Sequence, residues 1–163
     1  MPNNYADLSI RDANADDLPI INRMIHGLAE YERLAHECRA TEDKLRRTLF
    51  GNPRYAECVI ARIAEEPVGF ALFFHNYSTF AAQPGLYLED LFVLPQHRGH
   101  GVGRALLRHL AQIAVARECA RFEWAVLDWN EPAIGFYKAL GAVPMSDWTV
   151  MRVSGEALLA LAR

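Results

Sequence analysis

A chain of 163 residues, 52% of them hydrophobic, has the length and apolar content of one compact domain, so we expect a single domain over residues 1–163. Seventeen Lys and Arg against twenty Asp and Glu leave a formal net charge of −3, without an overall positive field for a nucleic acid or an anionic membrane. We expect neither partner. The charge is unevenly divided: residues 1–90 carry nine basic and fourteen acidic side chains, whereas residues 91–163 carry eight and six.

The cysteines and the N-terminal segment indicate a cytoplasmic protein. Three cysteines are an odd number, and none forms a CxxC pair, which argues against a disulfide framework or a zinc site. The histidines form no HxH or HExxH pattern, so we expect no metal. The N-terminus lacks a basic region followed by an apolar stretch, and no apolar run approaches the length of a membrane-spanning helix.

Apolar periodicity and capping residues predict the elements of the first half of the chain. They are a strand at 7–13, a helix from an Asn14 or Asp16 cap to about Leu34, a shorter helix opened by Thr41, and a hairpin of strands at 55–64 and 68–77.

The second half of the chain is also predicted to contain both strands and helices. Its predicted elements are a strand at 86–94, a helix at 102–119, a strand at 122–129, a helix capped by Asn130 and stopped by Gly141, a strand at 148–153 and a helix at 156–162. This order predicts a mixed sheet of the α/β or α+β class, flanked by helices.

A glycine-rich loop, RGHGVGR at 98–104, separates the strand at 86–94 from the following helix. Glycines at alternate positions allow tight turning, and the N–H groups at a helix N-terminus attract anions, so the loop predicts a pyrophosphate site. The alternative is a flexible turn before a basic surface helix. A Walker loop is excluded because residues 95–110 contain no lysine or hydroxyl residue. A dinucleotide fingerprint is a poor match, because Arg104 stands where the third glycine belongs.

The pattern RxxGxG, formed by Arg98, Gly101 and Gly103, resembles the acyl-CoA loop of the GNAT N-acetyltransferase superfamily. LAEYE (28–32), YLEDLFV (87–93) and WNEPAIGFYKALGA (129–142) are similar to landmarks of its diamine acetyltransferase family, in the same order. The resemblance implies the GNAT fold, a mixed and mostly antiparallel sheet with splayed central strands, and acetyl-CoA as cofactor.

The resemblance also implies how the cofactor is bound. The strand splays at residues 91–93, whose main chain pairs with the pantetheine arm, and the N–H of Phe92 polarises the thioester carbonyl. The residues implied to bind the cofactor are Leu91, Phe92, Val93, Arg98, Gly99, His100, Gly101, Val102, Gly103, Arg104, Asn130, Pro132, Ala133 and Tyr137.

Acetyl transfer to an amine needs a neutral amine and a proton for the leaving thiolate. Either of the adjacent acids Glu89 and Asp90 is a candidate to attract an ammonium group, and strand alternation lets at most one of them face a given site. The resemblance implies that Glu89 relays the amine proton through water and that Tyr137 is the general acid. The residues implied to face the substrate are Tyr31, Glu32, Glu89, Asp90, Glu123, Trp124 and Ala125.

The expected substrate is a small cationic metabolite with a primary amine. Ser78 stands where the polyamine enzymes have an acid, and NYST with AVLDWN is closer to the type that acetylates thialysine, a lysine-like amino acid. No residue sits in a nucleophile motif, which favours direct attack in a ternary complex. The resemblance further implies a homodimer with the C-terminal strand or helix at its interface. Alternatives are a CoA-binding module without catalysis and a protein or peptide N-acetyltransferase.

Overall fold

The computed structural model describes residues 7–163 and divides the chain into two compact units, the first ending at Ala125 and the second being Val126–Arg163. The first unit contains a five-stranded sheet whose spatial order follows the chain. Its strands are β1 (Leu8–Asp12), β2 (Glu57–Ile63), β3 (Glu66–Ser78), β4 (Gln83–Val93) and β5 (Phe122–Trp124). Neighbours from β1 to β4 are antiparallel, and β5 is parallel to β4. The predicted mixed, mostly antiparallel sheet is confirmed.

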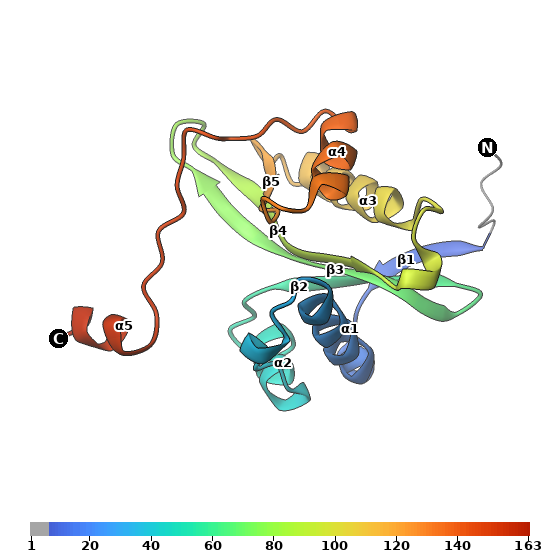
Figure 1. Ribbon diagram of the computed structural model, residues 1–163, viewed down its shortest axis with the longest axis horizontal. Helices are drawn as coiled ribbons and strands as arrows, with labels where there is room; N and C mark the ends of the chain where they lie inside the picture. Colours follow the sequence, from blue (N-terminus) through green and yellow to red (C-terminus); the bar gives the residue numbers. More distant parts are fainter. Residues whose placement is uncertain (1–6) are drawn as a thin grey trace. The chain divides into compact units, whose positions relative to one another are not determined.

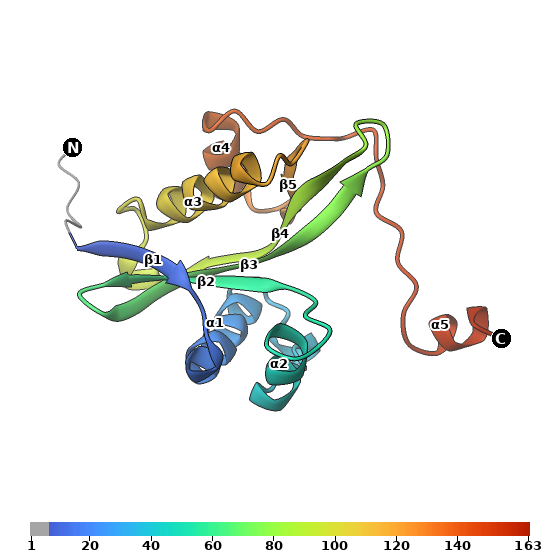
Figure 2. The same ribbon diagram turned by 180° about the vertical axis from the view of Figure 1, so that it is seen from behind.

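Three helices cover this sheet. The helices α1 (Leu18–Tyr31) and α2 (Glu42–Leu49) lie on one face, and α3 (Val102–Ala116) lies on the other (Figures 1 and 2). Thr41 caps α2 as predicted, because its hydroxyl accepts from the N–H of Lys44 at 3.3 Å. Asn14 caps a 3₁₀ turn (Ala15–Asp17) that leads into α1. The helix α1 ends before the predicted Leu34, since Arg33 has a φ of 62° and turns the chain away.

Apolar side chains at helical spacing anchor both layers to the sheet. Toward α1 and α2, the core contains Leu18, Ile21, Met24, Leu28, Leu45, Leu49, Cys58, Ile60, Phe70 and Phe92. On α3 the buried side chains are Val102, Leu106, Leu107, Leu110 and Ala114. This two-sided burial explains why β2 and the start of β3 are apolar without alternation.

A buried ion pair holds the start of α1 against the sheet. Asp17 and Arg62 are both buried, and an Nη of Arg62 donates to the Asp17 carboxylate at 2.8 Å. The Asp17 carboxylate also accepts from the main-chain N–H of Asn14 at 2.9 Å. These bonds join β2 to the first turn of α1 and so set the position of the helix that carries Tyr31.

The second unit contains α4 (Glu131–Ala139) and α5 (Gly155–Leu161). The Asn130 side chain accepts from the N–H of Ala133 at 3.4 Å, and Gly141 follows the helix with a φ of 94°. Both predicted ends of this helix are therefore confirmed.

Two strand predictions are wrong. The strand expected at 122–129 ends at Trp124, and the strand expected at 148–153 does not form. A β-strand needs a neighbour to accept and donate its main-chain hydrogen bonds. Within residues 7–163, β5 pairs only with β4, and no strand pairs with residues 148–153.

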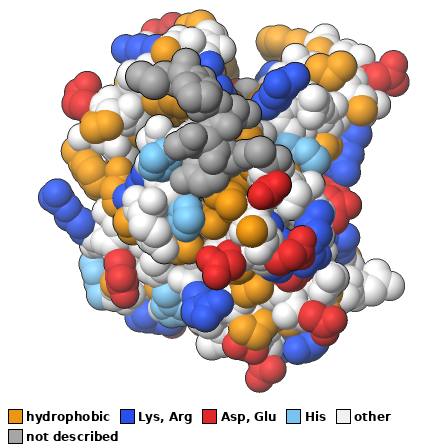
Figure 3. Space-filling model, turned by 90° about the vertical axis from the view of Figure 1, so that its right-hand side faces the viewer, with side chains coloured by type: hydrophobic (Ala, Val, Ile, Leu, Met, Phe, Trp, Pro, Cys, Tyr) orange, Lys and Arg blue, Asp and Glu red, His pale blue; other side chains and the backbone are white. Residues whose placement is uncertain are grey.

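The described part of the chain, residues 7–163, contains no helix with the length and apolar character to cross a membrane. On the face shown in Figure 3, acidic and basic side chains are interspersed. The acidic excess of residues 1–90 and the basic excess of residues 91–163 therefore do not produce separate acidic and basic regions on this face.

Candidate active site

The glycine loop leads directly into α3 and exposes the first N–H groups of that helix. Gly99 and Gly101 have φ values of 77° and 92°, which side-chain-bearing residues rarely adopt. Gly101 is the N-cap of α3 and has no side chain to occupy the N–H groups of Val102, Gly103 and Arg104. The first turn of α3 also has no acidic side chain that would compete with an incoming anion for these N–H groups. This geometry fits a pyrophosphate group, as the sequence predicts.

The strand β4 has an open edge beside this loop. The pairing of β5 with β4 begins at Leu86 and ends at Leu88, opposite Trp124, whereas β4 continues to Val93. On its other side β4 stays paired with β3 as far as Val93. The N–H of Leu94 donates to the Val68 carbonyl of β3, and main-chain groups alternate between the two sides of a strand, so those of Phe92 also face β3. The main chain of Leu91 and Val93 therefore offers an edge on the β5 side, suited to an amide-containing chain such as pantetheine.

A β-bulge places the two adjacent acids at this open edge. Leu72 of β3 pairs with Asp90 and Phe73 pairs with Leu88, so Glu89 is the extra residue. The bulge interrupts the strict alternation expected for this strand. Asp90 shares a face with its partner Leu72, which packs against the core under α1 and α2. Glu89 is exposed and Asp90 is partly buried.

The surroundings of Asp90 perturb its acidity. Burial, followed by the nearby charges of Glu89 and Glu32, raises the pKa of Asp90 from 3.8 to about 6. Burial also raises the pKa of Glu32, which follows the last residue of α1. The fold thus brings together three of the predicted substrate-side acids, from the end of α1 and the middle of β4. A cluster of carboxylates in a partly desolvated position favours a cationic ligand.

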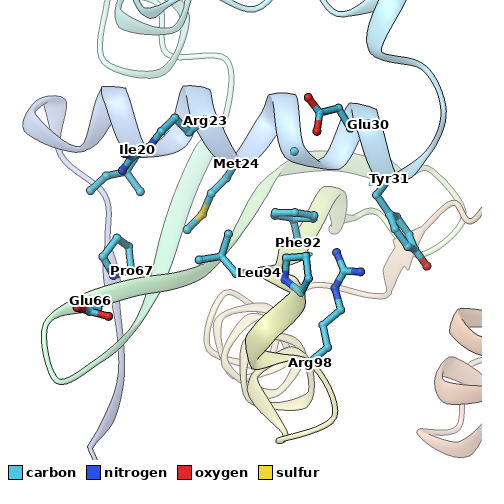
Figure 4. A pocket seen from close by; sticks show the side chains of 12 residues that line it. Ile20, Arg23, Met24, Glu30, Tyr31, Glu66, Pro67, Phe92, Leu94 and Arg98 are labelled. Carbon is cyan, nitrogen blue, oxygen red and sulfur yellow. The ribbon is translucent and has the colours of Figure 1, made fainter.

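A pocket of about 800 Å³ lies under α1, beside β4. Its apolar lining includes Ile20 and Met24 of α1, together with Phe92 and Leu94 (Figure 4). Gly27 faces the Phe92 ring, and a Cβ at Gly27 would lie 3.1 Å from Phe92 Cζ. The absence of a side chain at this position therefore gives the ring its place under the helix.

Arg98 lines one end of this pocket, with its side chain directed toward α1 (Figure 4). Its Nε–H donates to the carbonyl oxygen of Val93 at 2.9 Å. The guanidinium carbon lies 4.6 Å from the ring centroid of Tyr31 and 5.3 Å from that of Phe92. Arg98, which was expected to bind the cofactor, thereby contacts Tyr31, which was expected to face the substrate.

The remaining predicted residues of the first unit lie on β5 and in the loop. Glu123 is paired with Arg121 at 2.7 Å and accepts from the Asn76 side chain at 3.2 Å, so its carboxylate already has two partners. Trp124 is partly buried, with its ring edge-on to Phe122 at 5.0 Å, and Ala125 is exposed. Val102 is fully buried, so only its main chain is available to a ligand, whereas His100 and Arg104 are exposed.

The second unit holds the other predicted cofactor residues. Tyr137 lies on α4, partly buried, with its ring 5.5 Å from that of Phe136. Asn130, Pro132 and Ala133 form the start of α4, where Asn130 acts as the predicted cap. The motif WNEPAIGFYK thus forms one capped helix that presents a tyrosine in its second turn.

Sequence reasoning missed the part of α1 that lines the pocket. Ile20, Met24 and Gly27 recur at helical spacing on one face of the helix, which was a usable signal. The position of the Arg98 side chain had no local signal, because it depends on Tyr31, which is 67 residues away in the sequence.

Comparison with known proteins identifies the family of this chain. The acetyltransferase (GNAT) family model matches residues 22–142. Mouse (Mus musculus) thialysine N-epsilon-acetyltransferase is 38% identical over 168 residues, covering 96% of this chain and 98% of that protein. The L-ornithine N5-acetyltransferase of Arabidopsis thaliana is 32% identical, covering 93% of this chain and 86% of that protein. Among solved structures, an integron cassette protein from the mobile metagenome of V. cholerae has a TM-score of 0.81 at 26% identity, covering 96% of this chain and 98% of that one.

The residues present fit acetyl-CoA, since a helix N-terminus without a side-chain cap follows a strand whose edge is open on the β5 side. The family model covers well over half of the chain, and the two relatives align with nearly all of it. The chain therefore belongs to the acetyltransferase (GNAT) family and is an N-acetyltransferase that takes its acetyl group from acetyl-CoA.

Proposed function

We propose that this enzyme acetylates the distal primary amine of a small cationic metabolite, either a lysine-like amino acid such as thialysine or a di- or polyamine. The observation that carries the proposal is the cluster of Asp90, Glu89 and Glu32 beside the open edge of β4. An alkylammonium group with a pKa of about 10.4 is charged at neutral pH, and these carboxylates would attract it. Ornithine, spermidine and thialysine all carry such a group.

We assign cofactor binding, amine binding and proton transfer to different residues of the chain. The N–H groups at the start of α3 would hold the pyrophosphate, and the segment of Leu91, Phe92 and Val93 would pair with the pantetheine arm through the main-chain groups that face away from β3. Asp90 binds the ammonium group, and Glu89, exposed at the bulge, accepts its proton through water. Bound acetyl-CoA supplies an activated thioester for direct attack by the amine. Tyr137 donates its phenolic proton to the departing sulfur atom.

The family model matches residues in both units, so we propose that residues 1–163 act as one GNAT N-acetyltransferase domain. We also propose a cytoplasmic location, which the odd number of cysteines without disulfide spacing supports.

A thiol-release assay tests the substrate. Lysine, thialysine, ornithine, spermidine, an aminoglycoside and a lysine-containing peptide are offered separately with acetyl-CoA, and free CoA thiol is measured. We expect the highest kcat/KM with thialysine or ornithine, because each has a distal amine and needs fewer anionic contacts than a polycation. Turnover of the peptide alone would replace the proposal with a protein acetyltransferase. CoA binding without thiol release from any amine would indicate a binding module.

We further propose a homodimer that uses the C-terminal segment, residues 143–161. Large apolar side chains are exposed there, including Trp148 (78% exposed) and Met151 (86%), and residues 148–153 have a strand-like sequence without a strand partner in the described chain. Burial of these side chains against a second copy would remove them from water.

Light scattering tests this assembly. We expect the mass of two chains for the wild type and a shift toward the monomer mass when Trp148 and Met151 are both changed to Ser. The matched control changes Ser154 to Ala outside the apolar set. A monomer mass that is independent of concentration in the wild type would contradict the dimer.

A further inference from the structure

We propose that Arg98 is a positioning residue for the amine substrate: its side chain holds Tyr31, and thereby the end of α1, in place for the amine. This inference rests on the proposed function, which places Tyr31 on the substrate side. The resemblance had implied a cofactor contact for Arg98. In the structure the Arg98 side chain contacts the Tyr31 ring instead. The main-chain N–H groups of the glycine loop and the start of α3 would then bind the phosphates without it.

Three contacts fix the Arg98 side chain. The Nε–H bond to the Val93 carbonyl oxygen, 2.9 Å long, directs the side chain back along the end of β4. The planar guanidinium then lies over the rings of Tyr31 and Phe92, at 4.6 Å and 5.3 Å from their centroids (Figure 4). Stacking of this kind depends on a planar cation, and a lysine would lose both the plane and the Nε donor.

Arg98 therefore connects the glycine loop, where the cofactor would bind, to the end of α1, where the amine would bind. Arg98 is followed by Gly99, the first glycine of the loop with a positive φ. Tyr31 is the last residue of α1, directly before Glu32, whose charge acts on Asp90. A cofactor that orders the glycine loop would also restrain Arg98 against Tyr31. We therefore expect the amine to bind more tightly after the cofactor is bound.

A double-mutant cycle tests the link, with Arg98→Lys, Tyr31→Leu and the double variant. Arg98→Lys is expected to raise the amine KM about five- to tenfold, while the dissociation constant of CoA, measured by calorimetry, changes by less than about twofold. Tyr31→Leu is expected to raise the amine KM by a similar factor, and the double variant should be no worse than the more damaging single variant. Tyr31→Phe keeps the ring and should retain the coupling to Arg98.

Arg54→Lys is the matched control. Arg54 has the same arrangement elsewhere in the fold, because its Nε–H donates to the Ala56 carbonyl at 3.1 Å and its guanidinium lies 5.8 Å from the Phe50 ring centroid. This variant should leave the amine KM unchanged.

Two results would overturn the inference. If Arg98→Lys weakens CoA binding and leaves the amine KM unchanged, Arg98 is a phosphate ligand. If the two single effects multiply in the double variant, Arg98 and Tyr31 act independently. Failure of the proposed function looks different, since the wild type itself would then release no thiol with any small amine.

Discussion

Replacing Tyr137 with Phe is expected to lower kcat about 10²- to 10⁴-fold, the usual contribution of a positioned general acid, with CoA binding changed less than about twofold. The substitution removes one hydroxyl and keeps the ring that lies beside Phe136 on α4. Packing of the helix is thus retained, and only the proton for the departing thiolate is lost. Single-turnover acetylation measures the chemical step separately from product release.

The control for Tyr137→Phe is Tyr55→Phe, which removes the same hydroxyl from an exposed tyrosine outside the proposed site. This control should keep full activity. Full kcat for Tyr137→Phe across pH 6–9 would show that another group protonates the thiolate, and the role given to Tyr137 would be wrong.

The second large effect is expected from Asp90→Asn. Loss of the carboxylate removes the partner of a partly desolvated ammonium group, which should lower kcat/KM for the amine about 10²- to 10³-fold. The acetyl-CoA dissociation constant should stay unchanged, because Asp90 faces the α1 side of β4. Wild-type kcat/KM should also fall below about pH 6, as Asp90 takes up a proton, and the variant should lack this loss.

The same substitution is expected to stabilise the fold. Burial and the charges of Glu89 and Glu32 raise the pKa of Asp90 from 3.8 to about 6, so the folded state binds this proton more tightly than the unfolded state does. Ionisation of Asp90 therefore lowers the free energy of unfolding as pH rises from about 4 to about 6. An asparagine side chain cannot ionise, so Asp90→Asn should raise the free energy of unfolding at pH 7 by about 2–3 kcal/mol.

Urea unfolding at pH 4 and pH 7 measures this difference between Asp90→Asn and the wild type. Asp16→Asn, at an exposed acid, should match the wild type at both pH values. A variant that lost activity and also lost stability would show that Asp90 supports the fold. Unchanged kcat/KM would show that the amine binds elsewhere.

Local signals in the sequence determined much of the molecule. Thr41, Asn130 and Gly141 mark helix ends by their own main-chain chemistry, and the glycines at 99 and 101 adopt the positive φ values that the loop requires. Local rules were less successful with strands. The segment at 148–153 has a strand-like composition, but a strand also needs a neighbour, which composition does not supply.

The sequence by itself therefore determined the family, the glycine loop and the helix ends marked by Thr41, Asn130 and Gly141, because these features depend on residues close together in the chain. Only the tertiary structure decided three further features: the bulge at Glu89, the burial of Asp90 beside Glu32, and the stacking of Arg98 on Tyr31. Each joins different elements of the chain, and its energy comes from desolvation and packing once these elements meet. The strongly shifted pKa of Asp90 arises in this way, since charge and burial act through space and not along the chain.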